Sequence, residues 1–576
     1  MAPKTRPRAQ LSAAATSKAP PKSLIERICL PMGILTLAAI SSPVSQATLA
    51  PVFGAIPSAV NHQQAIIATS LLGFLLHYLP PKPRPGSVGQ YLAAISLFVP
   101  VVQMHIYPYS GILGPIAGPS LLGLLSCHTI IVPATYAAAE AMEALDLSSR
   151  VGPYVAPVLS TCLGVLYLVS FEGQAAYFLP SLNLLSQIFT PVKTQLLVGS
   201  TFAYLFPSKL SLLALPALAH TFLVNPHFDA ARNIDILNNQ LAQHNWTLLD
   251  RRWSNTGYIS ILESTDMHYR VMRCDHSLLG GEWLLTNQRR EEEGWLVDEP
   301  IYSVFEMLEA VRLIEDETKP SDAEAQALIV GLGIGTAPKA FFAHGINTTV
   351  IELDPAVHDF AKSYFNLPSN HTAVIRDAVS WADETVAEGS LKYDYIIHDV
   401  FTGGAEPLSL FTESFLRNLR SLLRPNGAIA LNYAGDVNFP LTAKVLNTID
   451  LVFNGQCRIF RDTPPSSETP DDKAAVNDDF TNIIIFCSNS PGQITFRRPT
   501  KADFLGSKSR EHYMLPDARL EIPFPLQKLP TRRQRVRTEA LQQGEEQQWA
   551  AQQADSAIKH WYVMRKVLPD AVWELW

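Results

Sequence analysis

An apolar segment that runs into three alternating glycines limits the fold of this chain more than any other feature. Residues 327–330 are Ala-Leu-Ile-Val, and Gly331, Gly333 and Gly335 follow at alternate positions. A second apolar segment reaches the carboxylate Glu352, 19 residues after Gly333. This order is typical of a doubly wound α/β sheet, in which glycines let the backbone approach a nucleotide or nucleoside. The sequence therefore predicts such a site in the second half of the chain.

Charged residues are distributed unevenly along the 576 residues. They make up 17% of the chain, below the ~25% of a typical soluble protein, and they are rare between residues 28 and 225. The formal net charge of −8 and a pI near 6.0 argue against a nucleic-acid partner. We expect five regions: a basic disordered arm (1–27), a transmembrane domain (28–225), a small β-hairpin module (246–300), a Rossmann-like α/β domain (301–500) and a helical tail (501–576).

The apolar runs between residues 28 and 225 are numerous enough for six to eight helices embedded in a lipid bilayer, since about 20 apolar residues cross the ~30 Å hydrocarbon core. The run at 196–224 contains Pro207-Ser208-Lys209, which is either a break between two spans or a kink in one. Basic residues in the arm and at Lys82 and Arg84 indicate that these segments face the cytosol. Six or eight spans return the second half to the cytosol. We therefore predict a multi-pass membrane protein with a cytosolic α/β domain.

The six cysteines lie far apart, without a C-x-x-C pair or the spacing of metal ligands. We expect free thiols in a reducing compartment or in lipid, and no metal site.

Strand signals in the second half converge on one sheet edge. Residues 258–263 and 268–275 alternate as a β-hairpin, which we expect to form a lid or a homodimer contact. Strands ending at Asp377 and Asp399 join the glycine loop and Glu352, and ligands bind beyond the carboxyl ends of such strands. A solvated strand end is the alternative for Glu352, a helix cap for Asp399 and simple packing for Tyr302.

Together these features resemble the S-adenosylmethionine-dependent transferase fold and, more closely, the spermidine/spermine synthase (polyamine aminopropyltransferase) family in a membrane-anchored form. The likeness covers roughly residues 246–488. It rests on the hairpin exit at 274–281, on Pro300-Ile301-Tyr302 before a helix, and on the segments 410–416 and 423–427.

The resemblance assigns roles to individual residues. It implies that Gly331, Gly333 and Gly335 line the amino-acid end of the nucleoside, that Glu352 holds the ribose and that Asp377 meets the adenine amino group. It also implies that Asp399 is the general base and that Tyr302 positions the attacking amine.

Two departures from the family pattern concern the acceptor. Ile334 and Thr402 stand where the family usually carries Asp residues that hold the aminopropyl group and the far end of a diamine. Glu406, His398 and Asp394 are candidates for a substitute group. The leading hypothesis is aminopropyl transfer from decarboxylated S-adenosylmethionine to a small-molecule amine. The alternatives are methyl transfer from S-adenosylmethionine, which Ile334 and Thr402 favour, and a catalytically silent membrane sensor of a nucleoside or polyamine.

Overall fold

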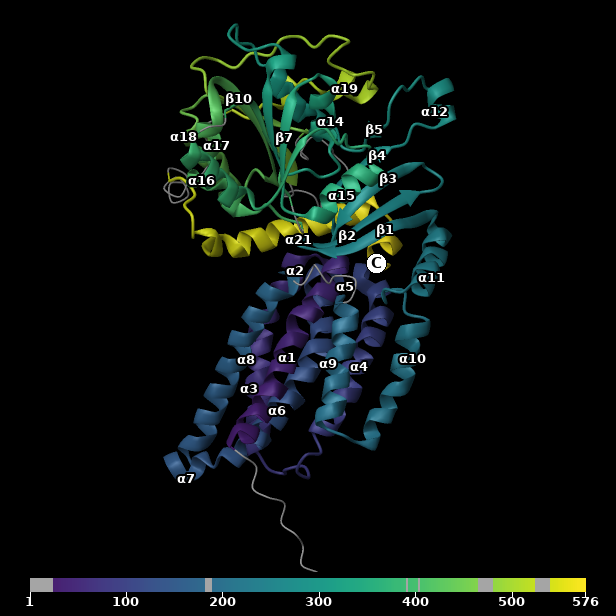
Figure 1. The fold of residues 1–576 in the computed structure, drawn as a ribbon, viewed down its shortest axis with the longest axis vertical. Helices are drawn as coiled ribbons and strands as arrows, with labels where there is room; N and C mark the ends of the chain where they lie inside the picture. The colour runs from purple at the N-terminus through teal and green to yellow at the C-terminus, as the bar shows by residue number, and fades with distance from the viewer. Residues whose placement is uncertain (1–23, 182–188, 390–391, 402–403, 465–479, 524–538) are drawn as a thin grey trace, which may run out of the picture.

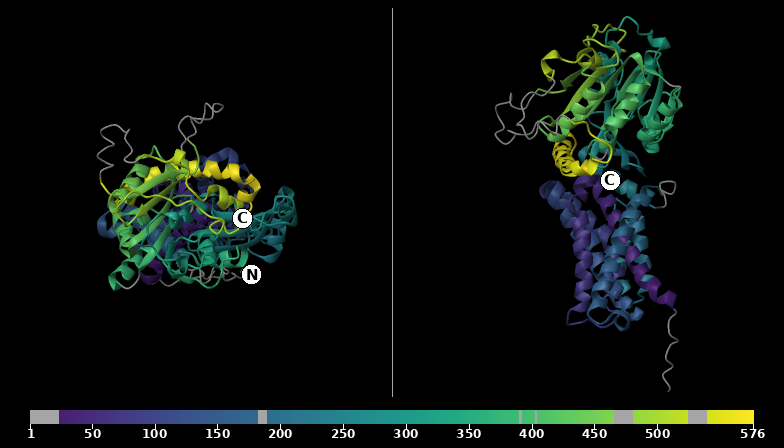
Figure 2. Two further views of the ribbon diagram at one scale, coloured as in Figure 1. Left: turned by 90° about the horizontal axis from the view of Figure 1, so that it is seen from above. Right: turned by 90° about the vertical axis from the view of Figure 1, so that its left-hand side faces the viewer.

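The computed structural model describes residues 24–181, 189–389, 392–401, 404–464, 480–523 and 539–576. Most of the predicted basic arm, together with Thr402, therefore lies outside the described residues. Two bodies are stacked along the long axis of the molecule, an α-helical bundle and an α/β body (Figure 1). The C-terminal helices lie between them, as the side view in Figure 2 shows.

The bundle is formed by apolar helices that pack around α1. Three helical stretches, Arg27–Phe53, Gly89–Leu145 and Val155–Leu179, are long and apolar enough to cross a membrane by length and composition. α1 packs along α6, α8 and α9, and α3 packs along α6. The main helices are α1 Leu24–Phe53, α3 His62–Tyr78, α4 Gly89–Ile106, α5 Ser110–Gly123, α6 Thr129–Met142, α8 Val155–Ser181, α9 Pro191–Leu205 and α10 Leu215–Leu223.

The two ends of α1 lie at opposite ends of the bundle. Near its start, Arg27 donates a hydrogen bond to the carbonyl oxygen of Ala144, in the turn that follows α6. Near its end, the carbonyl oxygen of Val52 accepts a 3.0 Å hydrogen bond from Trp561 of the C-terminal helix. The chain therefore enters the bundle at the end remote from the α/β body.

This arrangement contradicts the prediction that an even number of passes separates the arm from the α/β domain. The reason lies at Pro207 and Ser208, which separate α9 from α10. Lys193, near the start of α9, pairs with Asp229, just after α10, at 3.1 Å. α9 and α10 therefore run in opposite directions, and the apolar run 196–224 is two passes of the bundle.

The α/β body begins with a five-stranded antiparallel sheet that lies on the bundle. Its strands, in spatial order, are β1 Trp246–Ser254, β2 Gly257–Ser264, β3 Tyr269–Cys274, β4 Ser277–Trp283 and β5 Glu299–Pro300. The C-terminal helices α21 (Ala550–Val567) and α22 (Asp570–Glu574) pack against this sheet and the bundle. Trp576 is buried between Tyr107 of the bundle and Tyr258 of the sheet.

A seven-stranded sheet follows, in the order β11-β12-β10-β9-β6-β7-β8. β6 is parallel to β7 and β9, and the chain crosses from one side of β6 to the other after β8, which creates a switch point at the carboxyl ends of these strands. The strands are β6 Gln326–Val330, β7 Asn347–Glu352, β8 Thr372–Ile375, β9 Tyr393–His398, β10 Leu423–Asp436, β11 Cys457–Arg461 and β12 Phe480–Ser488.

Helices cover both faces of this sheet (Figure 1). Their apolar sides form two buried clusters with the strands, because each inner strand carries apolar side chains on both of its faces. The helices are α13 Val304–Met307, α14 Thr336–Ala343, α15 Pro355–Tyr364, α16 Ala378–Glu388, α17 Glu413–Leu422, α18 Pro440–Val452 and α19 Lys508–Tyr513.

The expectation of six free thiols is wrong for two of the cysteines. Cys457 and Cys487 form a disulfide. They face each other across the antiparallel strands β11 and β12, although 30 residues separate them in the sequence. A strand pairing formed across a long insertion is not visible as a cysteine spacing, so sequence inspection missed the bond. Cys29, Cys127 and Cys162 are free thiols.

Candidate functional site

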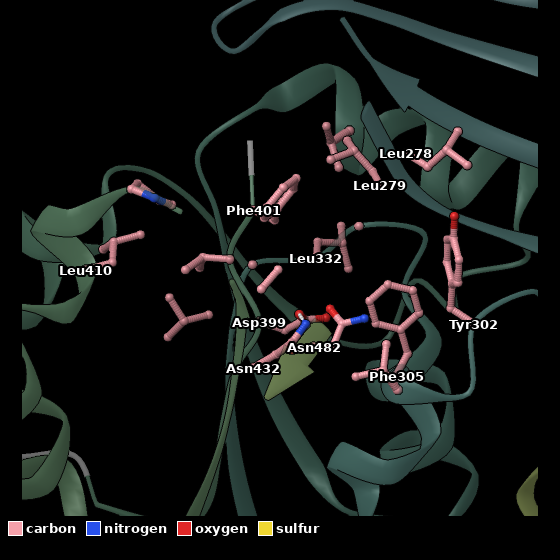
Figure 3. A pocket seen from close by; sticks show the side chains of 18 of the residues that line it. Leu278, Leu279, Tyr302, Phe305, Leu332, Asp399, Phe401, Leu410, Asn432 and Asn482 are labelled. Atoms are coloured by element: carbon pink, nitrogen blue, oxygen red, sulfur yellow. Dashed lines mark hydrogen bonds between the residues drawn. The ribbon is translucent and has the colours of Figure 1, made fainter. Parts of the chain in front are cut away.

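A cavity of about 560 Å³ opens at the carboxyl ends of β6, β7 and β9. Its lining comes from the glycine loop, from β10 and β12, from the five-stranded sheet and from α21. Figure 3 shows apolar side chains around the cavity and a group of polar ones near its centre. The switch point of the sheet and the cavity therefore coincide, as expected for a ligand site of this fold.

Two of the three loop glycines form the wall of the cavity. Gly331 has φ +86°, and a Cβ there would overlap the carbonyl oxygen of Asp399. Gly333 has φ +53°, and a Cβ there would lie 2.6 Å from the carbonyl oxygen of Leu279. Both positions therefore require glycine, and both present bare backbone to the cavity. Gly335 is the N-cap of α14 and packs near Leu367, and it is not part of the lining.

Glu352 lies at the end of β7, where it is held by backbone amides. One carboxylate oxygen accepts a 3.0 Å hydrogen bond from the Leu332 amide, and the other accepts a 2.8 Å bond from the Asp354 amide. Burial raises the pKa of Glu352 to about 7, although these amides oppose the shift. The side chain is thus fixed in the lining, with lone pairs left for ligand hydroxyl groups.

Asp377 caps helix α16 at the same edge of the sheet. Its carboxylate accepts hydrogen bonds from the amide and the hydroxyl of Ser380, at 2.9 and 2.7 Å. It also lines the cavity, next to Arg376 and Ala378. The capping function and a contact with a ligand are compatible, because a carboxylate can accept several hydrogen bonds.

Asp399 lies in the central part of the cavity, directly after β9. Its carboxylate accepts a 3.0 Å hydrogen bond from the side-chain amide of Asn432. Removal from bulk water raises the pKa of Asp399 to about 6, and the bond from Asn432 acts in the opposite direction. Within the described part of the chain, the hydrogen bond to this carboxylate comes from Asn432 and not from a backbone amide at the start of a helix, so nothing there indicates the helix cap left as an alternative.

Tyr302 lines the cavity on the side of the five-stranded sheet. Its hydroxyl is buried and has no hydrogen-bond partner within the described part of the chain. Figure 3 shows this hydroxyl pointing away from Asp399. Burial raises the pKa of Tyr302, so its hydroxyl is a neutral donor at physiological pH. Its role in positioning an amine remains a prediction.

An aromatic wall, made of Phe401, Phe480 and His560, was not predicted. The ring centroid of His560 lies 4.8 Å from that of Phe401 and 6.0 Å from that of Phe480, and all three residues line the cavity. A 3.1 Å contact joins His560 to the hydroxyl of Ser277. One face of α21 reaches the cavity, with His560, Val563, Met564 and Val567 at helical spacing. The sequence shows that these residues share a face, but it does not show which part of the protein that face contacts.

A polar cluster lies next to this wall, where β11 ends and β12 begins. Asp462 accepts hydrogen bonds from the Asn482 side chain at 2.8 Å and from the Thr481 hydroxyl at 2.5 Å. All three residues line the cavity. In Figure 3 Asn482 lies beside Asp399 and Asn432. The cavity lining thus has a fourth acidic residue, Asp462, besides Glu352, Asp377 and Asp399.

The groups considered as substitutes for the missing acids lie elsewhere. Ile334 packs against Gly280, and Glu406 is buried beside the cavity lining with one oxygen 2.5 Å from the Ala434 amide. His398 contacts the Leu410 carbonyl oxygen, and Asp394 accepts from the Gln326 amide. His398, Asp394 and Glu406 are therefore outside the lining, and the described lining provides no counter-charge at the position of Ile334.

Within the described ranges, no group of three or more His, Cys, Asp or Glu side chains is arranged to hold a metal ion.

Comparison with known proteins identifies the family to which the chain belongs. Residues 304–461 match the model of the spermine/spermidine synthase domain. Over 569 residues the chain is 37% identical to the N-terminal histidine N-methyltransferase of Emericella nidulans, a match that covers 96% of this chain and 98% of that protein. The chain belongs to the family of this N-terminal histidine N-methyltransferase. It is accordingly an S-adenosylmethionine-dependent transferase.

Two further matches cover shorter parts of the chain. A polyamine aminopropyltransferase of Vibrio vulnificus is 32% identical over 109 residues, which cover 18% of this chain and 36% of that protein. The eEF1A lysine and N-terminal methyltransferase of Xenopus laevis is 29% identical over 159 residues, which cover 26% of this chain and 22% of that protein. The transferase domain is thus similar to enzymes that carry out two different transfers.

Proposed function

We propose that this protein transfers a methyl group from S-adenosylmethionine to a nitrogen of an N-terminal histidine in a polypeptide acceptor. The observation that carries the proposal is the similarity to an enzyme of that name over nearly the whole length of both chains. Ile334 adds support, because this apolar residue is buried against Gly280 at the position where the polyamine family carries an acidic counter-charge. Methyl transfer, given above as the alternative, is thus better supported than aminopropyl transfer.

The residues of the cavity fit an adenosyl sulfonium. The backbone at Gly331 and Gly333 leaves room for its amino-acid end, Glu352 can accept the ribose hydroxyl hydrogens, and Asp377 is available to the adenine amino group. These are the roles that the family resemblance implied for the four residues. We infer that S-adenosylmethionine itself is the co-substrate.

Asp399 supplies the base in this scheme. A nitrogen lone pair of the acceptor forms a bond to the methyl carbon, the bond between that carbon and sulfur breaks, and its electron pair stays on sulfur. The methylated nitrogen group then loses one proton, which the carboxylate of Asp399 accepts. A carboxylate with a pKa of about 6 is ionised at pH 7 and is a stronger base than an ordinary aspartate.

The aromatic wall supplies a surface for the acceptor histidine. An imidazole ring stacks on aromatic side chains, and the wall lies on the cavity lining with Asp399. Burial lowers the pKa of His560 to about 4, so His560 is neutral and does not repel a positively charged N-terminus. Asp462 lies in the same part of the lining and can receive the charged amine.

We also infer that the helical bundle crosses the bilayer. Its surface exposes many large apolar side chains, among them Ile112, Val158, Leu166 and Leu212, which would be costly in water. Counted by direction, α1, α3, α4, α5 with α6, α8, α9 and α10 make seven passes. Retention in the membrane fraction after alkaline extraction tests this placement.

Purified full-length protein in lipid nanodiscs tests the reaction. It is incubated with methyl-labelled S-adenosylmethionine and a synthetic peptide that begins with histidine, and mass spectrometry locates the added 14 Da. The matched peptides carry an N-terminal acetyl group or begin with alanine. Labelling confined to the free histidine peptide supports the proposal. Transfer from decarboxylated S-adenosylmethionine to putrescine instead supports the polyamine reaction, and binding without turnover supports the sensor hypothesis.

A further inference from the structure

The direction of the bundle, its basic residues and three surface motifs together indicate which side of the membrane carries the transferase domain. We propose that this domain faces the non-cytosolic compartment and that Asn245, Asn347 and Asn370 are N-glycosylation sites there. The orientation rests on the membrane placement proposed above. It does not depend on which group the enzyme transfers.

Basic residues gather at the end of the bundle remote from the transferase domain. Arg27 contacts the turn after α6, and Lys82 pairs with Glu143 of that turn. Arg84, Arg150 and Lys209 belong to connections at the same end. The arm that precedes α1 adds five more basic residues, Lys4, Arg6, Arg8, Lys18 and Lys22. Short connections rich in Lys and Arg mark the cytosolic side of a membrane protein.

Near the opposite end, Lys193 lies in the first turn of α9 and pairs with Asp229, and Arg232 lies in the link from α10 to β1. The connections between helices of the bundle at this end carry no Lys or Arg. They are residues 54–61 between α1 and α3, residues 107–109 between α4 and α5, and residues 182–190 between α8 and α9. The asymmetry assigns this end, on which the transferase domain lies, to the non-cytosolic side.

The disulfide between Cys457 and Cys487 is an independent sign of the same orientation. It joins strands β11 and β12 of the transferase domain. Disulfides persist in oxidising compartments and are rare in the reducing cytosol. Three of the other cysteines, Cys29, Cys127 and Cys162, lie in helices of the bundle, and Cys274 is buried in strand β3.

Three Asn-x-Ser/Thr motifs lie on the surface of the transferase half. They are Asn245-Trp246-Thr247, Asn347-Thr348-Thr349 and Asn370-His371-Thr372, and each asparagine is exposed. The first 244 residues contain no such motif. Asn370 lies in the loop before the edge strand β8, where an added glycan extends into solvent without disturbing the sheet.

The modification needs a lipid-linked oligosaccharide, the glycosyl donor of the secretory pathway. The asparagine amide nitrogen forms a bond to the anomeric carbon of the first sugar. The bond between that carbon and the diphosphate of the lipid breaks, and the released diphosphate takes up the amide proton. This donor and its transferase act only on the non-cytosolic face, so a glycan on any of the three asparagines reports the orientation.

The test is a glycosidase mobility shift on the full-length protein expressed in a fungal host. We expect peptide N-glycosidase to increase the mobility of the native chain, and we expect no shift in the triple variant Asn245→Gln, Asn347→Gln and Asn370→Gln. The matched control is Gln10→Asn, which completes an Asn-x-Ser motif with Ser12 in the arm. We expect no glycan at that position. A glycan there, with none on the native chain, overturns the proposal.

Protease protection decides the orientation when glycans are absent. In sealed membrane vesicles with the cytosolic face outward, a C-terminal epitope should resist trypsin until detergent is added. Digestion without detergent overturns the orientation, and methyl-transfer activity has no bearing on this result. A protected domain without any glycan keeps the orientation and overturns the three modification sites.

Discussion

The side-chain amide of Asn432 donates a 3.0 Å hydrogen bond to the carboxylate of Asp399, and the two residues come from the neighbouring parallel strand regions of β10 and β9. Burial of the carboxylate raises its pKa, whereas the hydrogen bond stabilises its charged form. The balance gives a base that is ionised at pH 7 and still basic enough to accept a proton. The pair therefore sets the pH range of the proposed reaction.

Replacement Asp399→Asn should abolish most of the transfer while leaving S-adenosylmethionine binding within a factor of about three. Loss of a general base costs roughly 10²- to 10⁴-fold in rate. Single-turnover methylation of the histidine peptide measures the loss, and calorimetry with the sulfonium measures binding. The contrary outcome is a variant that keeps a tenth or more of the native rate.

The folding of the same variant provides its control. The pKa of Asp399 rises from 3.8 to about 6 in the folded state. The folded state therefore binds more protons than the unfolded state between about pH 4 and 6, and the charged carboxylate lowers the free energy of unfolding above that window. The neutral amide removes this cost. The unfolding temperature of Asp399→Asn at pH 7.5 should therefore not fall below that of the native protein.

Replacement Asn432→Ala should move the acidic limb of the pH profile to higher pH. The native kcat/KM should rise with pH through a midpoint near 6, where Asp399 ionises. Without the amide donor the carboxylate loses a stabilising contact, and its pKa rises further. The measurement is kcat/KM from pH 5 to 9 for both proteins. An unchanged midpoint with a uniformly lower rate would show that Asn432 only fills space.

The residues that sequence patterns located share one property, which is their position at the end of a strand. Gly331, Glu352, Asp377 and Asp399 each follow an apolar strand, and parallel strands bring such ends to one edge. Local spacing was therefore enough to predict which of these residues meet at one edge of the cavity. Gly335 is the exception. It belongs to the same glycine pattern, but it is the N-cap of α14 and does not line the cavity.

The aromatic wall of the cavity depends on contacts between distant segments. His560 reaches the cavity from α21, whose position follows from its packing between the bundle and the five-stranded sheet. Cys457 and Cys487 meet only because β11 pairs with β12. The orientation of the bundle followed from one break at Pro207 that the sequence left open. Such features are fixed by tertiary packing, which no window of the sequence contains.

Replacement Glu352→Gln should weaken S-adenosylmethionine binding about 10- to 100-fold, because a hydrogen bond to a charged group contributes about 1.5–3 kcal/mol. Glu388→Gln is the matched control, since Glu388 is exposed at the end of α16 and is not part of the cavity lining. We expect the control to bind normally. Calorimetry on both variants, with thermal unfolding as a check of folding, distinguishes ribose binding from a structural role of Glu352.

Asp377→Ser should separate helix capping from cofactor binding. Serine retains an oxygen that can accept from the Ser380 amide, so α16 should keep its N-cap and the protein its unfolding temperature. The carboxylate is lost, and the affinity for the adenine ring should fall about 5-fold or more. Calorimetry with S-adenosylmethionine and with adenosine measures the change. Unchanged affinities would assign Asp377 to the helix alone.

Replacement His560→Leu should impair use of the acceptor without affecting the cofactor. Leucine fills a similar volume but removes an aromatic surface from the wall formed with Phe401 and Phe480, and such ring contacts contribute about 0.5–1.5 kcal/mol. We expect the KM for the histidine peptide to rise about 3- to 10-fold at constant affinity for S-adenosylmethionine. The matched control is His512→Leu, because His512 is an exposed histidine on α19, and this variant should behave as the native protein.

Because the wall would select an aromatic first residue, the preference for histidine over alanine peptides should shrink in His560→Leu alone. An equal loss of activity with both peptides would indicate that α21 supports the shape of the cavity and does not contact the first side chain of the acceptor.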